Sequence, residues 1–324
     1  MILEKIKTEY YMCRIPGIIA TDKKTLVCYY ECRSEYSDWA QIDIKVIRST
    51  DGGKTFEKVH LVKGEGNTLN NPVMVQKDGV IHFLYLKNYR DLYYCTSTDD
   101  GKTFCEPVNI TNAFTDGNFF YNAAAIGPGH AIVHGNRILM PVWFAYNKQD
   151  PSAHGPSFIA TLYSDDDGKS WHLGERIGED FYLDPSECAL ASVGDEVIIS
   201  IRNGNACRLR GIAKSKSGID NWENVTFAGN LPDPICMGSM DAKGNTVYHI
   251  NCAFQNRALS HRGRINLTVK ASDDMFKTYR SVLVDERGGY SDIAIVDDKM
   301  HIIYERDFKD TENYALIFTT LKKV

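Results

Sequence analysis

The stretch Ser49-Thr-Asp-Gly-Gly-Lys-Thr-Phe56 decides the fold, because it recurs along the chain. Close copies run from Ser97 to Phe104 and from Ser164 to Trp171, and degenerate copies run from Ser215 to Trp222 and from Ser272 to Tyr279. Their first serines are 48, 67, 51 and 57 residues apart. Repeats at about fifty residues predict a β-propeller with about four strands in each blade.

The residue types of this repeat favour a structural role. Asp and Ser side chains hydrogen-bond nearby backbone groups and fix a turn, and Gly takes a positive-φ position. The closing aromatic residue is expected to pack under the hairpin. A calcium loop is the functional alternative for the Asp-rich copies, but the remaining Asp/Asn positions and the closing Glu of such a loop are missing. We therefore predict turns without a bound metal.

Short β-type runs bounded by turn residues lie between the repeats. Examples are residues 80–86, 137–144, 196–201 and 266–269. The chain shows neither long helical periodicity nor a low-complexity linker. We predict a single all-β domain over residues 1–324.

Composition excludes several classes of function. The net charge of −5 provides no overall basic field for nucleic acid. Residues 1–11 alternate charged and apolar residues without the apolar core of a signal peptide, so we expect a cytoplasmic protein without a membrane span. A chain whose leader had been removed would look the same. The nine cysteines form no CxxC pair and favour reduced, buried thiols.

Residues 288–305 predict a β-hairpin with polar groups at one end. Tyr290 follows two glycines at the start of an apolar run, and Asp297-Asp298 supply the turn. The returning strand ends on Glu305. A tyrosine in this position is more often a rim aromatic than a functional group, so the hairpin alone does not decide between these roles.

Three arginines lie at the ends of apolar runs. Arg14 precedes Ile-Pro-Gly-Ile-Ile, Arg202 follows Val-Ile-Ile-Ser-Ile, and Arg264 precedes Ile-Asn-Leu-Thr-Val. Taken singly, each is better explained as a surface residue or a salt-bridge partner. Strand ends of a propeller converge near its axis, however, so guanidinium groups from three blades can meet around one anion and hold a carboxylate.

Together these motifs resemble those of the exo-sialidases (neuraminidases) of bacterial and animal type. The repeats are similar to the Asp-boxes of that family, Arg14-Ile-Pro to its N-terminal motif, and Gly-Tyr290-Ser-Asp to its tyrosine motif. The resemblance extends from Arg14 to Glu305. It implies a six-bladed β-propeller of four-stranded antiparallel blades, a sialylated glycan as the partner, and no cofactor.

The resemblance also implies roles for individual residues. Arg14, Arg202 and Arg264 match the arginines that grip the carboxylate of sialic acid, with Arg262 as an alternative to the third. Tyr290 matches the nucleophile, and Glu187 in Asp-Pro-Ser-Glu-Cys matches the glutamate paired with it.

Three further positions complete the implied site. Asp38 matches the mobile acid/base aspartate, although Asp43 is a rival that has the pattern of a strand residue. Arg33 matches an arginine that shapes the pocket, and Glu305 matches the carboxylate that orients the first arginine.

The chemistry explains why a tyrosine belongs in such a site. The anomeric carbon of sialic acid carries a carboxylate, which would repel a carboxylate nucleophile, and sialidases use tyrosine instead. A free phenol has a pKa of about 10, so it needs a base such as Glu187. Asp38 would protonate the leaving oxygen and then activate water, which gives net retention. We therefore predict a retaining exo-α-sialidase.

Departures from the family pattern leave the sugar preference open. Cys13 replaces an aromatic residue before Arg14, and Asn71 stands near a position where many members have an aspartate. Alternatives to hydrolysis are transfer to an acceptor, release of an anhydro sugar, or hydrolysis of a related nonulosonic acid. A catalytically silent sialoglycan-binding propeller is the alternative from another class.

Overall fold

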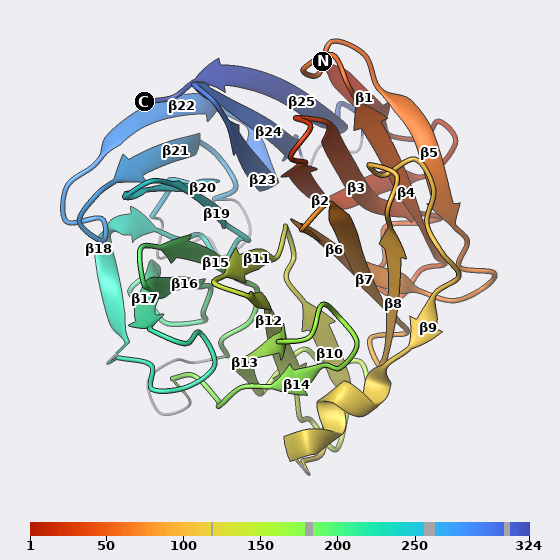
Figure 1. Cartoon of the computed structure of the whole chain (residues 1–324), viewed down its shortest axis with the longest axis horizontal. Helices are drawn as coiled ribbons and strands as arrows, with labels where there is room; N and C mark the ends of the chain where they lie inside the picture. The colour runs from red at the N-terminus through yellow and green to blue at the C-terminus, as the bar shows by residue number, and fades with distance from the viewer. Residues whose placement is uncertain (118, 179–183, 224, 256–262, 308–311) are drawn as a thin grey trace.

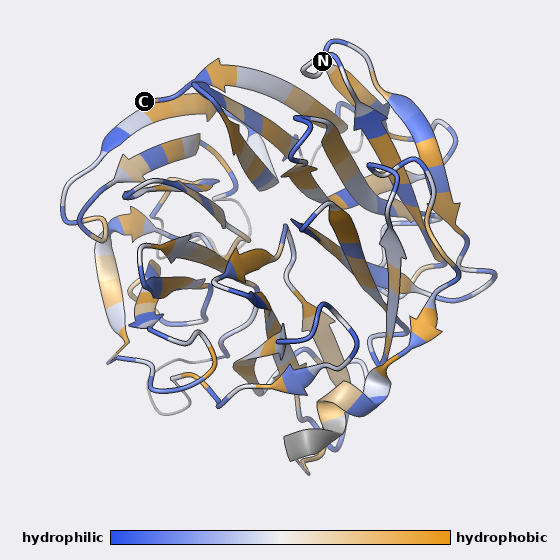
Figure 2. Cartoon of the chain, viewed as in Figure 1, coloured by the Kyte–Doolittle hydropathy of each residue, from blue (hydrophilic) through white to orange (hydrophobic). Residues whose placement is uncertain are grey.

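The computed structural model describes residues 1–117, 119–178, 184–223, 225–255, 263–307 and 312–324. Six antiparallel sheets are arranged in a ring around a central axis, as Figure 1 shows. The predicted six-bladed β-propeller is confirmed. Figure 2 shows hydrophobic residues mainly on the strands and hydrophilic residues on the turns.

Each blade runs outward from the axis, with its innermost strand first in the chain for the first five blades. The first blade contains β2 (Met12–Ala20), β3 (Leu26–Arg33), β4 (Ile42–Ser49) and β5 (Glu57–Val62). The second contains β6 (Leu69–Lys77), β7 (Val80–Lys87), β8 (Asp91–Ser97) and β9 (Val108–Asn109). The fourth contains β15 (Cys188–Val193), β16 (Glu196–Ile201), β17 (Leu209–Ser215) and β18 (Thr226–Pro232). The fifth contains β19 (Ser239–Lys243), β20 (Thr246–Cys252), β21 (Leu267–Ser272) and β22 (Arg280–Asp285).

The third blade differs because its inner position is divided between two short strands. Both β10 (Ala123–Ile126) and β11 (Ile132–His134) pair with β12 (Arg137–Ala145), which continues to β13 (Ser157–Ser164) and β14 (His172–Leu173). A 3₁₀ helix, η1 (Thr111–Gly117), precedes this blade. No helix in the described ranges is long and apolar enough to cross a membrane.

The two ends of the chain close the ring together. The sixth blade contains β23 (Gly288–Val296), β24 (Lys299–Arg306) and β25 (Ala315–Lys322), and its outer strand is the N-terminal β1 (Ile2–Lys5), paired antiparallel with β25. The turn from a third to a fourth strand is therefore absent from this blade. This explains why five repeats serve six blades.

In the first five blades, the repeats form the turns between the third and fourth strands. Their side chains hydrogen-bond the local backbone, as predicted. In the first, Asp51 accepts hydrogen bonds from the backbone N–H groups of Lys54 and Thr55 at 2.9 and 3.0 Å. The hydroxyl and the N–H of Thr55 lower the pKa of Asp51 below its ordinary value. Gly53 has a φ of +84°, and a methyl group there would lie 2.3 Å from a ring carbon of Phe318 in the sixth blade. The turn of the first blade therefore packs closely against the sixth, and only glycine fits at position 53 without a shift of the Phe318 ring.

Apolar side chains of neighbouring blades pack against one another and form the hydrophobic core. Between the first two blades, Val27 and Tyr29 pack with Phe83 and Tyr85 in one buried cluster. Because inner strands are covered on both faces by neighbouring blades, they are nearly continuous apolar runs, and β3 is buried at every position.

A charged group at the centre joins four blades. His130 Nδ1 lies 2.8 Å from Asp292 Oδ1, and Asp292 also accepts hydrogen bonds from the backbone of Ile18 and the hydroxyl of Ser239. Burial lowers the pKa of His130, but the charge and hydrogen bond of Asp292 outweigh burial and raise it to about 9. The imidazole is therefore protonated at neutral pH.

The ion pair at His130 predicts a loss of stability in mild alkali. Because its folded pKa lies above the ordinary value of 6.5, its contribution is complete below that value and is lost as the pH rises through about 9. We expect the free energy of unfolding to fall by on the order of 3 kcal/mol across this window. Denaturant unfolding at several pH values measures the fall, and His130→Gln should flatten it. A wild-type profile as flat as that of the variant would contradict the assignment.

Candidate active site

The fold brings together one end of every blade. In antiparallel blades, the starts of first strands and the ends of second strands meet at the same face of the ring. Arg14 lies near the start of β2 and Tyr290 near the start of β23. Arg33 ends β3, and Glu305 lies near the end of β24. Residues distant in sequence therefore surround one axis.

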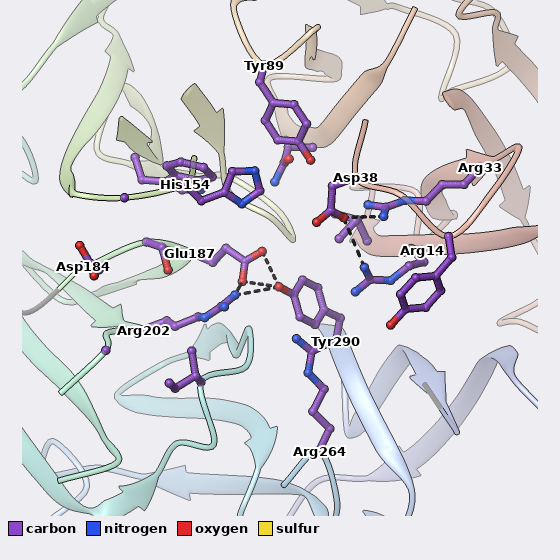
Figure 3. Close-up of a pocket in the computed structure, with 18 residues that line it drawn as sticks. Arg14, Arg33, Asp38, Tyr89, His154, Asp184, Glu187, Arg202, Arg264 and Tyr290 are labelled. Atoms are coloured by element: carbon purple, nitrogen blue, oxygen red, sulfur yellow. Dashed lines mark hydrogen bonds and ion pairs between the residues drawn. The ribbon is translucent and has the colours of Figure 1, made fainter. Parts of the chain in front are cut away.

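A cavity of about 750 Å³ opens at this face. Figure 3 shows the labelled side chains around it, with Tyr290 between Glu187 and Arg202 on one side and Arg14 and Asp38 on the other. Glu305 is fully buried behind Arg14. The lining residues are Arg14, Ile15, Arg33, Tyr36, Asp38, Asn71, Tyr89, Trp143, His154, Gly155, Asp184, Ser186, Glu187, Arg202, Gly204, Ile235, Arg264 and Tyr290.

Tyr290 and Glu187 form a direct pair. The phenol Oη lies 2.7 and 2.6 Å from the two carboxylate oxygens of Glu187, to which it donates its proton. Arg202 Nη1 donates to the same phenol oxygen at 2.8 Å and also contacts Glu187. A carboxylate that accepts the phenolic proton beside a cation can assist formation of a phenolate.

Two further guanidinium groups border the Tyr290 ring. The Arg14 and Arg264 carbons Cζ lie 5.1 and 4.8 Å from the ring centroid. Glu305 holds Arg14, accepting from its Nε at 3.0 Å and from the backbone N–H of Ile15 at 3.1 Å. The three arginines named from the sequence are thus assembled around one tyrosine. The alternative third arginine, Arg262, lies outside the described residues.

Asp38 lies across the cavity, held by two cations. Its Oδ1 lies 2.5 Å from Arg33 Nη1 and 3.7 Å from Arg14 Nη1. Arg33 is itself fixed by the buried Glu31, whose Oε2 accepts from Arg33 Nη2 at 2.6 Å. Burial raises the pKa of Asp38, but Arg33 and Arg14 outweigh burial and lower it to about 2. In this arrangement Asp38 is therefore ionised at neutral pH.

The rival aspartate has a different position. Asp43 lies within β4, accepts hydrogen bonds from Tyr10 Oη at 3.0 Å and Gly64 N at 2.8 Å, and does not line the cavity. Its side chain therefore links β4 to the segments that precede β2 and follow β5.

One side of the cavity is an aromatic wall formed by Tyr89, Trp143 and His154, which was not predicted from the sequence. His154 lies 5.5 Å from Tyr89 and 5.4 Å from Trp143 between ring centroids, and all three line the cavity. Burial lowers the pKa of His154. Trp143 lies within the apolar run 137–144 that predicted a strand, but Tyr89 and His154 lie in connections with no recognisable motif. Among the described residues, no group of three or more His, Cys, Asp or Glu side chains is placed to hold a metal ion.

This combination defines a six-bladed propeller with an arginine-lined pocket at one face, in which a tyrosine is paired with a glutamate. Residues 57–302 match the model of the BNR repeat-like domain, and the chain belongs to that family.

Its relatives include several sialidases. The chain is 28% identical to "Sialidase" of Bacteroides fragilis over 90% of its own length and 59% of the relative's. It is also 28% identical to "Sialidase-2" of Rattus norvegicus, over 81% of this chain and 78% of that one. Among solved structures, Hadza microbial sialidase Hz136 superposes with a TM-score of 0.78 at 23% identity, over 97% of this chain and 66% of that one. Trypanosoma rangeli sialidase gives 0.76 at 22%, over 96% of this chain and 55% of that one. The chain thus spans less than two thirds of several of these proteins, and the structural matches establish the fold.

Proposed function

We propose that this propeller is a single catalytic domain that hydrolyses terminal α-linked sialic acid with retention of configuration. The observation that carries the proposal is the Tyr290–Glu187 pair, bordered by Arg14, Arg202 and Arg264. Three permanent cations match a carboxylate on the substrate, and a tyrosine matches an anomeric carbon that bears that carboxylate. The names of its relatives support the same substrate class.

In the proposed first step, the arginines bind the substrate carboxylate and place the anomeric carbon over Tyr290 Oη. Glu187 takes the phenolic proton as the oxygen attacks, which gives a tyrosyl-sugar and breaks the glycosidic bond. Asp38 gives a proton to the departing oxygen. In the second step Asp38 removes a proton from water, which attacks the same carbon. The bond between that carbon and Tyr290 Oη breaks, and Glu187 returns its proton to the phenol oxygen. Two displacements give net retention.

The acid role of Asp38 requires its pKa to change on binding. In the free protein Arg33 and Arg14 hold that pKa at about 2, which favours a carboxylate. A bound substrate carboxylate neutralises part of the positive charge around Arg14, so the pKa of Asp38 rises. Binding of the substrate thus favours the protonated form of Asp38, which acts as the acid. Donation of that proton to the leaving oxygen then leaves the carboxylate that activates water.

Binding of a carboxylate-bearing transition-state analogue should therefore be coupled to proton uptake. At a pH between about 2, the pKa of Asp38 in the free protein, and its raised pKa in the complex, we expect uptake of a fraction of one proton for each analogue bound. Calorimetry in buffers of different ionisation enthalpy measures this fraction. Asp38→Asn should abolish it, so uptake that is unchanged in the variant, or missing from the wild type, contradicts the coupling.

The function itself is tested by release of a fluorophore from an aryl α-sialoside between about pH 5 and 7, with the same analogue as inhibitor. Inhibitable release is the expected result. Tight binding of the analogue without release would instead indicate a silent sialoglycan-binding propeller. Absence of both would overturn the assignment of the three arginines.

A further inference from the structure

Two large aromatic side chains flank Asp38 and face solvent. Tyr36 is 51% exposed and Trp39 is 40% exposed, although most large hydrophobic side chains of this chain are buried. Leaving this much apolar area in water forgoes burial free energy, and neighbouring exposed aromatics often mark a binding surface. Neither residue is needed for the chemistry proposed above.

The connection that carries them is well fixed. The backbone N–H of Trp39 donates to Ser37 Oγ at 3.0 Å, and Thr68 donates its hydroxyl proton to the carbonyl of Ala40. The Trp39 ring centroid lies 4.8 Å from that of Tyr89 and 6.4 Å from that of His154. The indole is therefore held against the second blade, with part of its surface exposed beside the cavity.

The position of Asp38 determines what these rings would meet. A general acid must come within hydrogen-bond distance of the glycosidic oxygen that it protonates. The group on the far side of that oxygen therefore leaves the cavity past Asp38. Tyr36 lines the cavity two residues before Asp38, and Trp39 follows it directly. Tyr36 therefore borders the path of this group directly, and Trp39 borders it through its contacts with the cavity residues Tyr89 and His154.

We propose that Tyr36 and Trp39 form a binding site for a neutral hexose joined to the sialic acid, which rests on the proposed function. A hexose ring presents a face of C–H groups that packs on an aromatic ring, and its hydroxyls remain in water. Arg33, the cation nearest to Asp38, is paired with both Glu31 and Asp38, so the exposed aromatic pair suits a neutral sugar. Binding there supplies free energy remote from the reacting bond, which raises kcat/KM for substrates that carry the second sugar.

Two substrates with similar leaving groups test the site. Sialyllactose and methyl α-sialoside both release an alcohol that needs protonation, but only the first carries a hexose. We expect Trp39→Ala to lower kcat/KM for sialyllactose about tenfold and to leave that for methyl α-sialoside within about twofold. Inhibition by free lactose should weaken to a similar extent. Trp39→Phe, which keeps an aromatic face, should retain most of the preference.

Each other result overturns the proposal. Equal losses on both substrates mean that Trp39 only positions Asp38, and unchanged rates on both mean that the ring touches no substrate. If Trp39→Ala does not fold, Tyr36→Ala gives the same comparison. Tyr279→Ala is the control, because Tyr279 is 43% exposed in the turn before β22 and does not line the cavity. If the wild type hydrolyses neither substrate, the proposed function is refuted. If the wild type hydrolyses both and Trp39→Ala does not lose activity selectively on sialyllactose, only the hexose site is refuted.

Discussion

Replacing Tyr290 with phenylalanine is expected to lower kcat for aryl and natural sialosides by about a thousandfold or more, while a carboxylate-bearing analogue still binds. The change removes only the oxygen that lies 2.6–2.7 Å from Glu187. The ring that Arg14 and Arg264 border remains in place. The variant therefore lacks the attacking oxygen but keeps the groups that bind the substrate carboxylate. Steady-state kinetics together with calorimetry of analogue binding measures both.

The same chemical change on the same hairpin provides the control. Tyr304 lies on β24, and its hydroxyl donates to Asp285 at 2.9 Å, away from the cavity. Tyr304→Phe should leave kcat within about twofold, since only one peripheral hydrogen bond is lost. Near-normal turnover by Tyr290→Phe would exclude Tyr290 as the nucleophile. Loss of analogue binding in that variant would show that the substitution disturbs the arginines as well.

Removal of the Asp38 carboxylate should have a large effect that depends on the leaving group. For sialyllactose, whose departing alcohol needs a proton, we expect Asp38→Ala to lower kcat/KM by about 10²–10⁴-fold. An aryl sialoside departs more readily without protonation, so its kcat/KM should fall by at least tenfold less. The comparison requires only steady-state kinetics on the two substrates.

Glu35→Gln is the matched control for Asp38→Ala, because Glu35 is an exposed acid on the same connection and does not line the cavity. Its kinetics should match the wild type on both substrates. Equal losses for the two leaving groups in Asp38→Ala would assign protonation to another group. Asp43, which bonds Tyr10 and Gly64, is not placed to supply it.

Local patterns in the sequence predicted much of this molecule. The repeats that begin at Ser49, Ser97 and Ser164 encode their own hydrogen bonds, so their turns can be read from short windows. The hairpin of Tyr290 and Glu305 is equally local, with the predicted turn at residues 297–298 between β23 and β24. These two features determine the propeller and the position of its tyrosine.

Features that depend on contacts between distant segments could not be predicted in this way. The pairing of β1 with β25 follows from ring closure, and no short pattern at residue 2 encodes it. The wall of Tyr89, Trp143 and His154 combines side chains from two blades. The low pKa of Asp38 arises from Arg33 and Arg14, which only the folded ring brings within reach.

A trapped intermediate would test the central claim, attack by Tyr290, most directly. A 2,3-difluorosialic acid binds Trypanosoma rangeli sialidase as a covalent intermediate. We expect the same reagent to inactivate this protein and to add one fluorosialyl group to the peptide that contains Tyr290, as measured by mass spectrometry after digestion. Tyr290→Phe should not be labelled. An adduct on any other side chain, such as Glu187, or active turnover without a covalent adduct would contradict the account.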